Sequence, residues 1–474
     1  MSQRTVHIGG ASGAWGDSPM AIPQLLTAEI DYFVMDYLAE VTMSLLARAR
    51  MKDPAAGFPP DFVQMLAANM PAIAERGIRV VTNAGGVNPA ACRDALMAAA
   101  QEKGLSPKIA IVEGDDMLPH AGLLEVESGP KYLPDLLTAN AYLGALPIRA
   151  ALEAGADIVI TGRCADSALA LAVLMHEFGW REDDYDRLAA GSLVGHVLEC
   201  GPQATGGIHT DWEKVPGWEN IGYPIAACAE DGSFTLSKPP ETGGLITPGV
   251  VAEQVLYEIG DPAAYLLPDV AADFSHVTLV QEGPDRVHVS GARGRPPTPH
   301  YKVSATWLDG YRAVATFSIV GPDAARKAIR TADALVARGR AILRRNGLAD
   351  FNATHAEALG AEASYPPGAR NEATREVVLR LVVSHSERRA LELFSKEVGS
   401  IGISFAPGTT GIMGGRPRPT PLIRLLTAFV EKAKLPAPVV TFEGRSFDAE
   451  VPRGVALEPV ESPAGETAAA TAET

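Results

Sequence analysis

An arginine and two aspartates stand just after short apolar runs in the first 170 residues. Arg163 and Asp166 follow the run at residues 158–160, and Asp115 follows the run at residues 109–112. A carboxylate can remove a proton from a substrate, and a guanidinium beside it can bind a carboxylate or phosphate group. These residue types predict acid–base chemistry on an anionic substrate, with Asp115 or Asp166 as the base and Arg163 as the anion anchor.

Two pairs of charged residues in these turns, Arg163 with Asp166 and Asp115 with Asp116, have alternative interpretations. Arg163 and Asp166 could form an internal salt bridge that only shapes their turn, or a clamp for a substrate carboxylate. The adjacent Asp115 and Asp116 could shift one another's pKa, hold Mg²⁺ or form a solvated turn. Because no histidine or third carboxylate stands at ligand spacing nearby, the sequence predicts no metal site and leaves Mg²⁺ as an alternative.

Glycine-rich stretches add candidates for substrate contact. Ser12 and Asp17 belong to a loop around residues 9–16 that lacks the Gly-Lys-Ser/Thr ending of a P-loop. Its glycines could equally permit a tight turn, with Asp17 as a helix cap. Lys238 stands between glycine-rich segments, where it could reach a phosphate or simply be a surface lysine.

Alternating strands and helices must position these residues. Apolar strand-like runs, one of them at residues 32–38, alternate with helical segments, one of them at residues 142–154, as far as residue 174. This alternation indicates right-handed crossovers and a mainly parallel sheet with helices on both faces. Ligands bind beyond the carboxyl ends of such strands, so we expect one cleft there. Backbone N–H groups of the turn that contains Asn83, Gly85 and Gly86 would stabilise an oxyanion. Glu40 is a third candidate catalytic carboxylate. The candidate site residues are Ser12, Asp17, Glu40, Asn83, Gly85, Gly86, Asp115, Asp116, Arg163, Asp166 and Lys238.

The composition and the predicted secondary structure of the chain change beyond this region. The glycines of residues 191–207 predict little regular structure. Within this stretch Cys200 could join His196 and Glu199 in a catalytic group, or it could be a small buried residue. Short alternating strands begin near residue 271, with a hairpin signal at Asp309-Gly310. We therefore predict an α/β domain over residues 1–270, a smaller α+β domain over residues 271–454 and a disordered tail over residues 455–474.

Composition excludes several classes of protein. The net charge of -16 argues against nucleic-acid binding, which depends on clustered Lys and Arg. No apolar run approaches the roughly 20 residues of a membrane span, and no signal peptide is indicated at the start. The four cysteines are widely spaced, without a Cys-x-x-Cys pair, so the sequence predicts a cytoplasmic protein without a zinc site.

The polar turns occur in a series that resembles the core of the acyclic terpene utilisation AtuA family from near residue 5 to about residue 450. The resembling segments are residues 10–17 (Gly-Ala-Ser-Gly-Ala-Trp-Gly-Asp), 37–40 (Tyr-Leu-Ala-Glu), 82–89 (Thr-Asn-Ala-Gly-Gly-Val-Asn-Pro), 114–116 (Gly-Asp-Asp), 140–145 (Asn-Ala-Tyr-Leu-Gly-Ala), 160–166 (Ile-Thr-Gly-Arg-Cys-Ala-Asp), 195–201 (Gly-His-Val-Leu-Glu-Cys-Gly) and 222–225 (Gly-Tyr-Pro-Ile).

The resemblance implies a role in acyclic terpene or branched-acid catabolism. Members of the family have been suggested to cleave carbon–carbon bonds of branched 3-hydroxyglutaryl-type CoA thioesters. We therefore expect a lyase or hydratase that acts on a branched carboxylated acid or its CoA thioester, in a homo-oligomer. Some longer relatives carry a further small domain. The alternative is thus a non-catalytic large subunit, or acyl-CoA-binding module, that works with a small partner protein.

Overall fold

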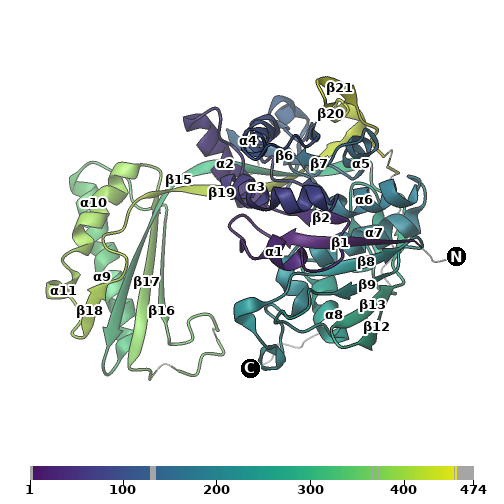
Figure 1. Ribbon diagram of the computed structural model, residues 1–474. Coiled ribbons are helices and arrows are strands. Elements are labelled where there is room, and N and C mark those ends of the chain that lie inside the picture. The colour runs from purple at the N-terminus through teal and green to yellow at the C-terminus, as the bar shows by residue number, and fades with distance from the viewer. Residues whose placement is uncertain (1–3, 129–134, 366, 372, 453, 456–474) are drawn as a thin grey trace, which may run out of the picture. The chain divides into compact units, whose positions relative to one another are not determined.

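The computed structural model describes residues 4–128, 135–365, 367–371, 373–452 and 454–455 (Figure 1). The chain divides into two compact units. Unit 1 comprises residues 1–133, 137–305 and 426–474, and unit 2 comprises residues 134–136 and 306–425. The longer segment of unit 2, residues 306–425, is thus inserted between two segments of unit 1. The sequence instead suggested a domain boundary near residue 270. The predicted tail lies outside the described residues from residue 456 onward.

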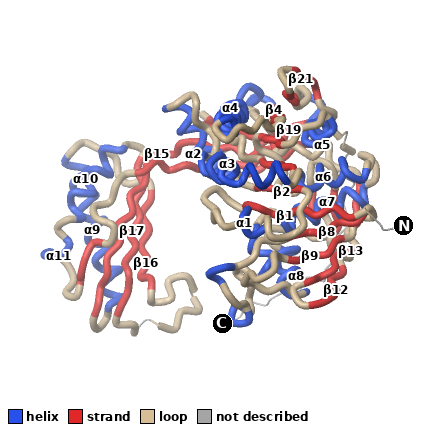
Figure 2. Tube along the Cα trace, in the orientation of Figure 1, coloured by secondary structure: helices blue, strands red, loops and turns tan. Residues whose placement is uncertain are grey.

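A mixed β-sheet is the framework of unit 1 (Figure 2). Its strands, in the order of hydrogen-bonded neighbours, are β12 (Thr278–Gly283), β13 (Arg286–Ser290), β9 (Phe234–Ser237), β8 (Ile225–Ala229), β1 (Thr5–Ser12), β2 (Tyr32–Met35), β3 (Arg79–Thr82), β7 (Ile158–Thr161), β4 (Ile109–Glu113), β20 (Val439–Phe442) and β21 (Arg445–Asp448). The five neighbours from β1 to β4 are parallel. Because β8 and β20 join them in the antiparallel direction, the predicted parallel order is limited to the centre of the sheet.

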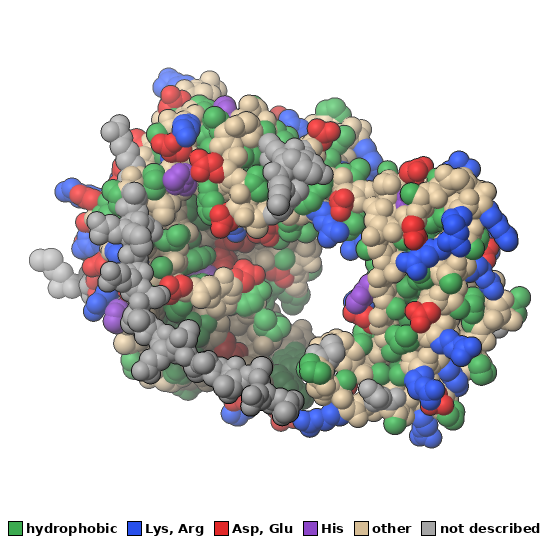
Figure 3. Space-filling model, turned by 180° about the vertical axis from the view of Figure 1, so that it is seen from behind, with side chains coloured by type: hydrophobic (Ala, Val, Ile, Leu, Met, Phe, Trp, Pro, Cys, Tyr) green, Lys and Arg blue, Asp and Glu red, His purple; other side chains and the backbone are tan. Residues whose placement is uncertain are grey.

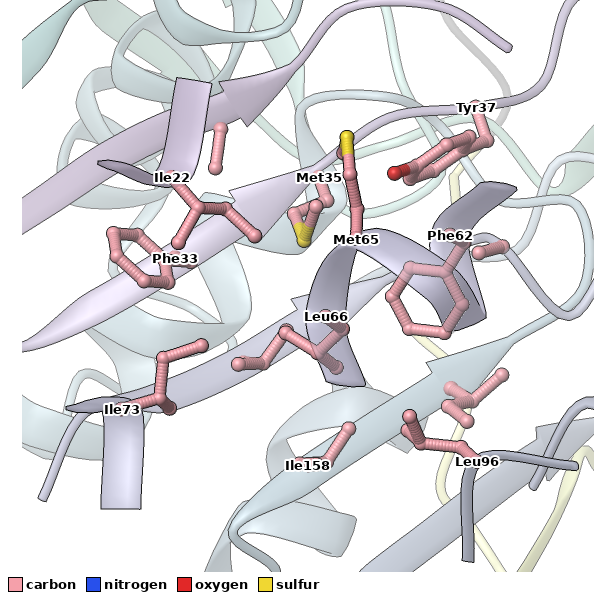
Figure 4. Packing of buried hydrophobic residues seen from close by; sticks show 14 of the residues in the cluster. Ile22, Phe33, Met35, Tyr37, Phe62, Met65, Leu66, Ile73, Leu96 and Ile158 are labelled. Carbon is pink, nitrogen blue, oxygen red and sulfur yellow. The ribbon is translucent and has the colours of Figure 1, made fainter. Parts of the chain in front are cut away.

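Helices cover both faces of the parallel strands. One layer contains α1 (Ala21–Leu25), α3 (Pro60–Glu75) and α4 (Pro89–Gln101), and the other contains α5 (Leu146–Glu153), α6 (Ala168–Phe178) and α7 (Tyr185–Leu198). Phe33 of β2 packs with Ile22 and Leu66 of the first layer (Figure 4). The neighbouring Tyr32 points to the opposite face, as successive strand residues do, and its hydroxyl is hydrogen-bonded to Glu177 of α6. The apolar alternation of the strands thus builds a core on each face.

Helix α7 occupies part of the stretch for which little regular structure was predicted. A Cβ on Gly195 would lie 2.4 Å from the carbonyl oxygen of Ser167, so only glycine lets α7 approach the start of α6 so closely. A Cβ on Gly191 would lie 2.7 Å from Leu171 Cδ1 and 3.0 Å from Trp180 Cζ3, so this glycine also allows close packing. The prediction was wrong because glycine costs a helix only about 1 kcal/mol, and close helix packing outweighs that cost here.

Two element boundaries differ from the sequence interpretation in a way that matters for the site. Strand β2 ends at Met35, so Asp36 is the first residue beyond it rather than an interior strand residue. Tyr142, expected to begin a helix, instead follows strand β6 (Leu136–Ala141), and α5 begins only at Leu146. Both polar side chains therefore stand at strand ends.

Unit 2 is built on antiparallel strands. Strand β15 (His300–Val320) pairs with β17 (Glu376–His385), which pairs with β16 (Ala353–Leu359). The predicted hairpin at Asp309-Gly310 is wrong, because β15 continues through it and pairs residue by residue with β17 from position 311 to 320. Tertiary pairing thus overrides the local turn preference of an Asp-Gly pair.

Two helices pack on this sheet. Leu335 of α9 (Ala324–Arg345) and Leu391 of α10 (Arg388–Val398) lie in one buried cluster with Phe317 of β15. Within the described residues, none of the helices combines the length and apolar character that a membrane crossing requires.

Charge is distributed unevenly along the chain. Residues 306–425 contain 17 Lys and Arg against 11 Asp and Glu, although the whole chain has a net charge of -16. Lys and Arg side chains accordingly gather on the visible face of unit 2 (Figure 3). The argument from net charge against a nucleic-acid partner therefore applies to unit 1 and not to unit 2.

Candidate functional site

Polar residues follow the carboxyl ends of the parallel strands at one edge of the sheet in unit 1. Asp36 follows β2, Asn83 follows β3, Asp115 follows β4 and Arg163 follows β7. Ser12 is the last residue of β1. Because neighbouring parallel strands end at the same edge, the topology brings together residues that are far apart in sequence.

Arg163 is the centre of this group. Its side chain is buried, and its Nη1 donates hydrogen bonds to the carbonyl oxygen of Leu38 and to Asp166 Oδ1, both at 2.6 Å. Its Cζ lies 4.3 Å from the centre of the Tyr142 ring, which is a cation–π distance. The Arg163 backbone N–H donates to Asp115 Oδ2 at 2.9 Å. One residue therefore contacts both carboxylates that the sequence proposed as bases.

Two carboxylates, Asp36 and Asp166, interact with the Arg163 charge, and Glu199 interacts with both of them. Burial raises the pKa of Asp36 to about 6, against the opposing effects of Arg163 and of the Asn83 hydrogen bond, and Glu199 adds to the rise. Burial also raises the pKa of Asp166 well above its usual value, although Arg163 opposes this, and the charges of Asp36 and Glu199 raise it further. Burial and the repulsion between these carboxylates therefore both act to raise the pKa values of Asp36 and Asp166, against the attraction of one cation.

His196 and Glu199 lie at the end of α7 beside this group. His196 Nδ1 lies 2.9 Å from Glu199 Oε1, and the imidazole is almost fully buried against Tyr265 and Phe274. Although burial lowers it, the Glu199 carboxylate leaves the pKa of His196 raised. Burial raises the pKa of the neighbouring Cys200 thiol, so this cysteine lacks the activation that nucleophilic catalysis needs.

A cavity of about 350 Å³ opens beside Asp166, and we call it the Asp166 cavity. The polar residues of its wall are Glu125, Tyr142, Asp166, Thr298, His300 and Lys302. Its other lining residues include Tyr265, Leu266, Leu267, Pro268 and Phe429. All of these belong to unit 1. A carboxylate, a cation and an apolar wall in one small space suit a small acid with an apolar branch.

Tyr142 connects this cavity with Glu40, the first residue of α2 (Glu40–Lys52). The Tyr142 hydroxyl donates to Glu40 Oε1 at 2.7 Å, and its ring centre lies 4.8 Å from Lys302 Nζ. Although burial raises it, the hydrogen bond from Tyr142 together with Arg163 and Lys302 leaves the pKa of Glu40 lowered. Glu40 is therefore held as a carboxylate that orients the phenol.

Asp115 faces a second cavity, of about 530 Å³, which we call the Asp115 cavity. Its Oδ2 accepts hydrogen bonds from the Asn140 side-chain amide at 2.8 Å and from the Arg163 backbone. Burial raises the pKa of Asp115 to about 6, against these two hydrogen bonds. Gly86 and Asp116 also line this cavity. The single cleft expected from the sequence thus corresponds to two cavities with different linings.

The remaining candidates have structural partners. Asn83 donates to Asp36 and accepts from the Tyr37 backbone N–H at 2.8 Å. A Cβ on Gly85 would lie 2.6 Å from the carbonyl oxygen of Thr161, so this glycine permits β3 and β7 to end side by side. Ser12 Oγ donates to the Asp36 carbonyl oxygen at 3.0 Å. None of these three residues is among the lining residues of the two cavities.

Asp17 and Lys238 lie apart from both cavity linings. Asp17 accepts hydrogen bonds from the Tyr223 hydroxyl and from the backbone of Gly13. Lys238 Nζ lies 3.1 Å from Asp285 Oδ2. A magnesium site built from Asp17, Asp115 and Asp116 would require Asp17 to reach across β2, β3 and β7. Among the described residues no group of three or more His, Cys, Asp or Glu side chains is placed to hold a metal ion.

Sequence reasoning missed three residues of the group. Asp36 was taken as a strand residue, Tyr142 as a helix start, and Lys302 as part of a separate domain. The boundary of a short strand is poorly defined by propensity alone, which hid Asp36. Lys302 carried no local signal, because its place in the site depends on a contact between distant segments. The Tyr142 backbone N–H donates to the Lys302 carbonyl oxygen at 3.0 Å and so holds the two residues side by side.

Comparison with known proteins places the chain in a family. No curated protein and no solved structure matches it. The family described as acyclic terpene utilisation family protein AtuA matches residues 6–441, which include every strand end discussed above. The chain therefore belongs to the acyclic terpene utilisation AtuA family.

Proposed function

We propose that this protein is a lyase or hydratase that acts on a branched carboxylated acid or on its CoA thioester. The proposal is carried by one observation: Asp166, a carboxylate with a raised pKa, lines a small cavity that also contains the Lys302 ammonium and an apolar wall. Membership of a family implicated in acyclic terpene utilisation supports the choice of a branched substrate.

Lys302 is the proposed anion anchor. The sequence suggested Arg163 for this role, but the Arg163 side chain is buried and its Nη1 is shared between Leu38 and Asp166. Lys302, in contrast, is exposed and lines the Asp166 cavity together with His300. We therefore assign substrate binding to Lys302, and to Arg163 the task of holding Asp166 in position.

Asp166 is the proposed base for either reaction. In a hydratase working in the dehydration direction, its carboxylate takes the proton from the carbon next to the carbonyl. The electron pair forms the double bond, and the hydroxyl on the next carbon leaves as water after it receives a proton. In a lyase, Asp166 takes the proton of that hydroxyl, the carbon–carbon bond breaks to leave a carbonyl group, and the resulting enolate is then protonated on carbon.

The Tyr142 and Glu40 pair supplies the complementary group. The phenol has one O–H, which donates to Glu40 in the free protein, so a substrate oxygen must replace Glu40 as its acceptor before it can donate a hydrogen bond or a proton to the leaving hydroxyl or to an enolate oxygen. The ring also lies against both Arg163 and Lys302, which holds it rigidly at the cavity wall. A base and a donor on separate sheet-edge segments are what both reactions need.

Kinetics of the purified chain test this proposal with a panel of branched 3-hydroxy acids and their CoA thioesters. Asp166→Asn should lower kcat at least about a hundredfold, the usual contribution of a general base. Lys302→Met should raise KM about tenfold, and Lys302→Arg should recover part of that loss. Lys214→Met, which removes an exposed lysine paired with Asp211, serves as the matched control. An Asp166→Asn variant with full activity would rule the proposal out.

The alternative proposal is a non-catalytic large subunit that presents an acyl-CoA to a small partner protein. It is favoured by the fact that Asp36 and Glu199, whose charges act on Asp166, do not line the Asp166 cavity themselves. Assays of the purified protein alone, and then together with a co-encoded small protein, separate the two proposals. Turnover by the isolated chain rejects the subunit role, and turnover only in the mixture supports it.

A further inference from the structure

The Asp115 cavity takes no part in the chemistry proposed above. It lies between α2, the turns after β3 and β4, and residues 137–140 of strand β6, and its lining residues all belong to unit 1. Met51, Val87, Leu118 and Leu137 form apolar parts of its wall. Its volume of about 530 Å³ far exceeds the roughly 30 Å³ of a water molecule, so it can hold a small organic ligand.

Asn140, one of the lining residues of this cavity, has a buried hydrogen-bond acceptor without a donor. Asn140 is 4% exposed, and its amide nitrogen is committed to Asp115 Oδ2 at 2.8 Å. Asn140 Oδ1 is fully buried and has no hydrogen-bond partner among the described residues. A buried carbonyl oxygen without a donor is costly, so this atom indicates a ligand group that donates.

The charge of the lining favours a cationic donor. Glu113, Asp115 and Asp116 contribute three carboxylates, whereas Arg50 is the one cation among the lining residues. The Arg50 guanidinium donates to the carbonyl oxygen of Val87, which directs one of its N–H groups to the backbone. An anionic ligand would face the carboxylates, while an ammonium group would be attracted to them.

We propose that the Asp115 cavity binds a small molecule that carries a primary ammonium group on a short apolar chain. The ammonium donates to Asn140 Oδ1 and to the Asp115 carboxylate, and the chain packs against Met51, Leu118 and Leu137. Burial of the carboxylate without a cation raises the pKa of Asp115, and a bound ammonium would lower it again. This site is separate from the one that carries the proposed reaction.

Calorimetric titration of the full-length protein with n-butylammonium chloride tests the inference. Saturable binding is expected, whereas n-butanol, which lacks the charge, and butyrate, which reverses it, should bind at least about tenfold more weakly. Ammonium chloride and potassium chloride are titrated as inorganic controls, which test whether the cavity binds any small cation. If either binds as tightly as n-butylammonium, the cavity is an inorganic cation site and the proposed ligand class is wrong.

Variants connect the binding to this cavity. Asn140→Leu removes the acceptor and should weaken n-butylammonium at least about tenfold. Because that change also breaks the contact with Asp115, Leu137→Trp provides a second route by filling the cavity while leaving Asn140 and Asp115 in place. Asp116→Asn, on the exposed rim, should weaken binding a fewfold and reduce its salt dependence. Unchanged affinity in both Asn140→Leu and Leu137→Trp would overturn the assignment.

Asp166→Asn separates this inference from the proposed reaction. It should abolish turnover while leaving n-butylammonium affinity unchanged, because Asp166 does not line the Asp115 cavity. Loss of both properties in this variant would mean that the two cavities form one site, and would contradict the inference.

Discussion

Arg163 Nη1 lies 2.6 Å from Asp166 Oδ1, three positions along the same turn, and Asp166 forms the wall of a cavity while Arg163 is enclosed beneath it. A buried cation thus supports a carboxylate at the surface of the cavity. The arrangement keeps Asp166 in one orientation and sets how readily it exchanges a proton. It also couples the stability of the fold to the chemistry of the site.

Removing Arg163 should therefore destabilise the protein. Arg163→Met leaves Asp36 and Asp166 without their compensating charge, and we expect the free energy of unfolding to fall by about 3–5 kcal/mol. Urea denaturation at pH 7 measures this loss. Arg388→Met is the matched control, because Arg388 forms an exposed pair with Glu392 and its removal should cost at most about 0.5 kcal/mol. Equal losses in the two variants would contradict the central role of Arg163.

The raised pKa of Asp115 predicts a pH-dependent stability difference. A carboxyl whose folded pKa lies above its unfolded value binds more protons in the folded state, so its contribution to stability falls as pH rises from about 4 to about 6. Asp115→Asn removes this titration. The variant should therefore gain stability relative to the wild type between pH 4 and pH 7, by about 1.4 kcal/mol per unit of pKa shift. Urea unfolding of both proteins at the two pH values checks this, and a difference independent of pH would count against it.

Tyr142→Phe should separate the hydroxyl from the ring. The ring stays between Arg163 and Lys302, so stability should change little, while kcat should fall about a hundredfold because the proton donor is lost. Loss of the hydrogen bond should also raise the pKa of Glu40, which an NMR titration of its carboxyl carbon can follow. Tyr142→Ala is the comparison, because it removes the ring as well. Full activity in Tyr142→Phe would exclude the phenol as donor.

Gly195→Ala tests the packing of α7 on α6. The new Cβ would meet Ser167 backbone atoms at 2.4 and 2.5 Å, so we expect a loss of about 1–3 kcal/mol from forced separation of the helices. Gly249→Ala is the control, in α8 (Pro248–Leu256), where the nearest atoms lie 3.7 Å away. That change should leave stability equal or raise it by up to about 1 kcal/mol, as alanine does in helices. Thermal unfolding followed by circular dichroism distinguishes the two outcomes.

The sequence by itself determined much of the framework of this protein. Apolar runs of strand length, each followed by a polar turn and a helix, predicted parallel strands with their polar turns at one edge, because such periodicity depends only on neighbouring residues. The ordered series of turns was also enough to indicate the AtuA family. Asp115, Arg163 and Asp166 were recognised in this way, since each stands just beyond a clear strand.

Only the tertiary structure decided which side chains face a cavity and which support them. Lys302 reaches the Asp166 cavity through pairing between segments far apart in sequence, and Arg163 is enclosed because Leu38, Tyr142 and Asp166 close around it. Periodicity carries no information about such contacts, because they depend on how strands β6 and β15 and the neighbouring turns pack in three dimensions. The same long-range packing made residues 185–198 a helix, where their glycines alone suggested a loop.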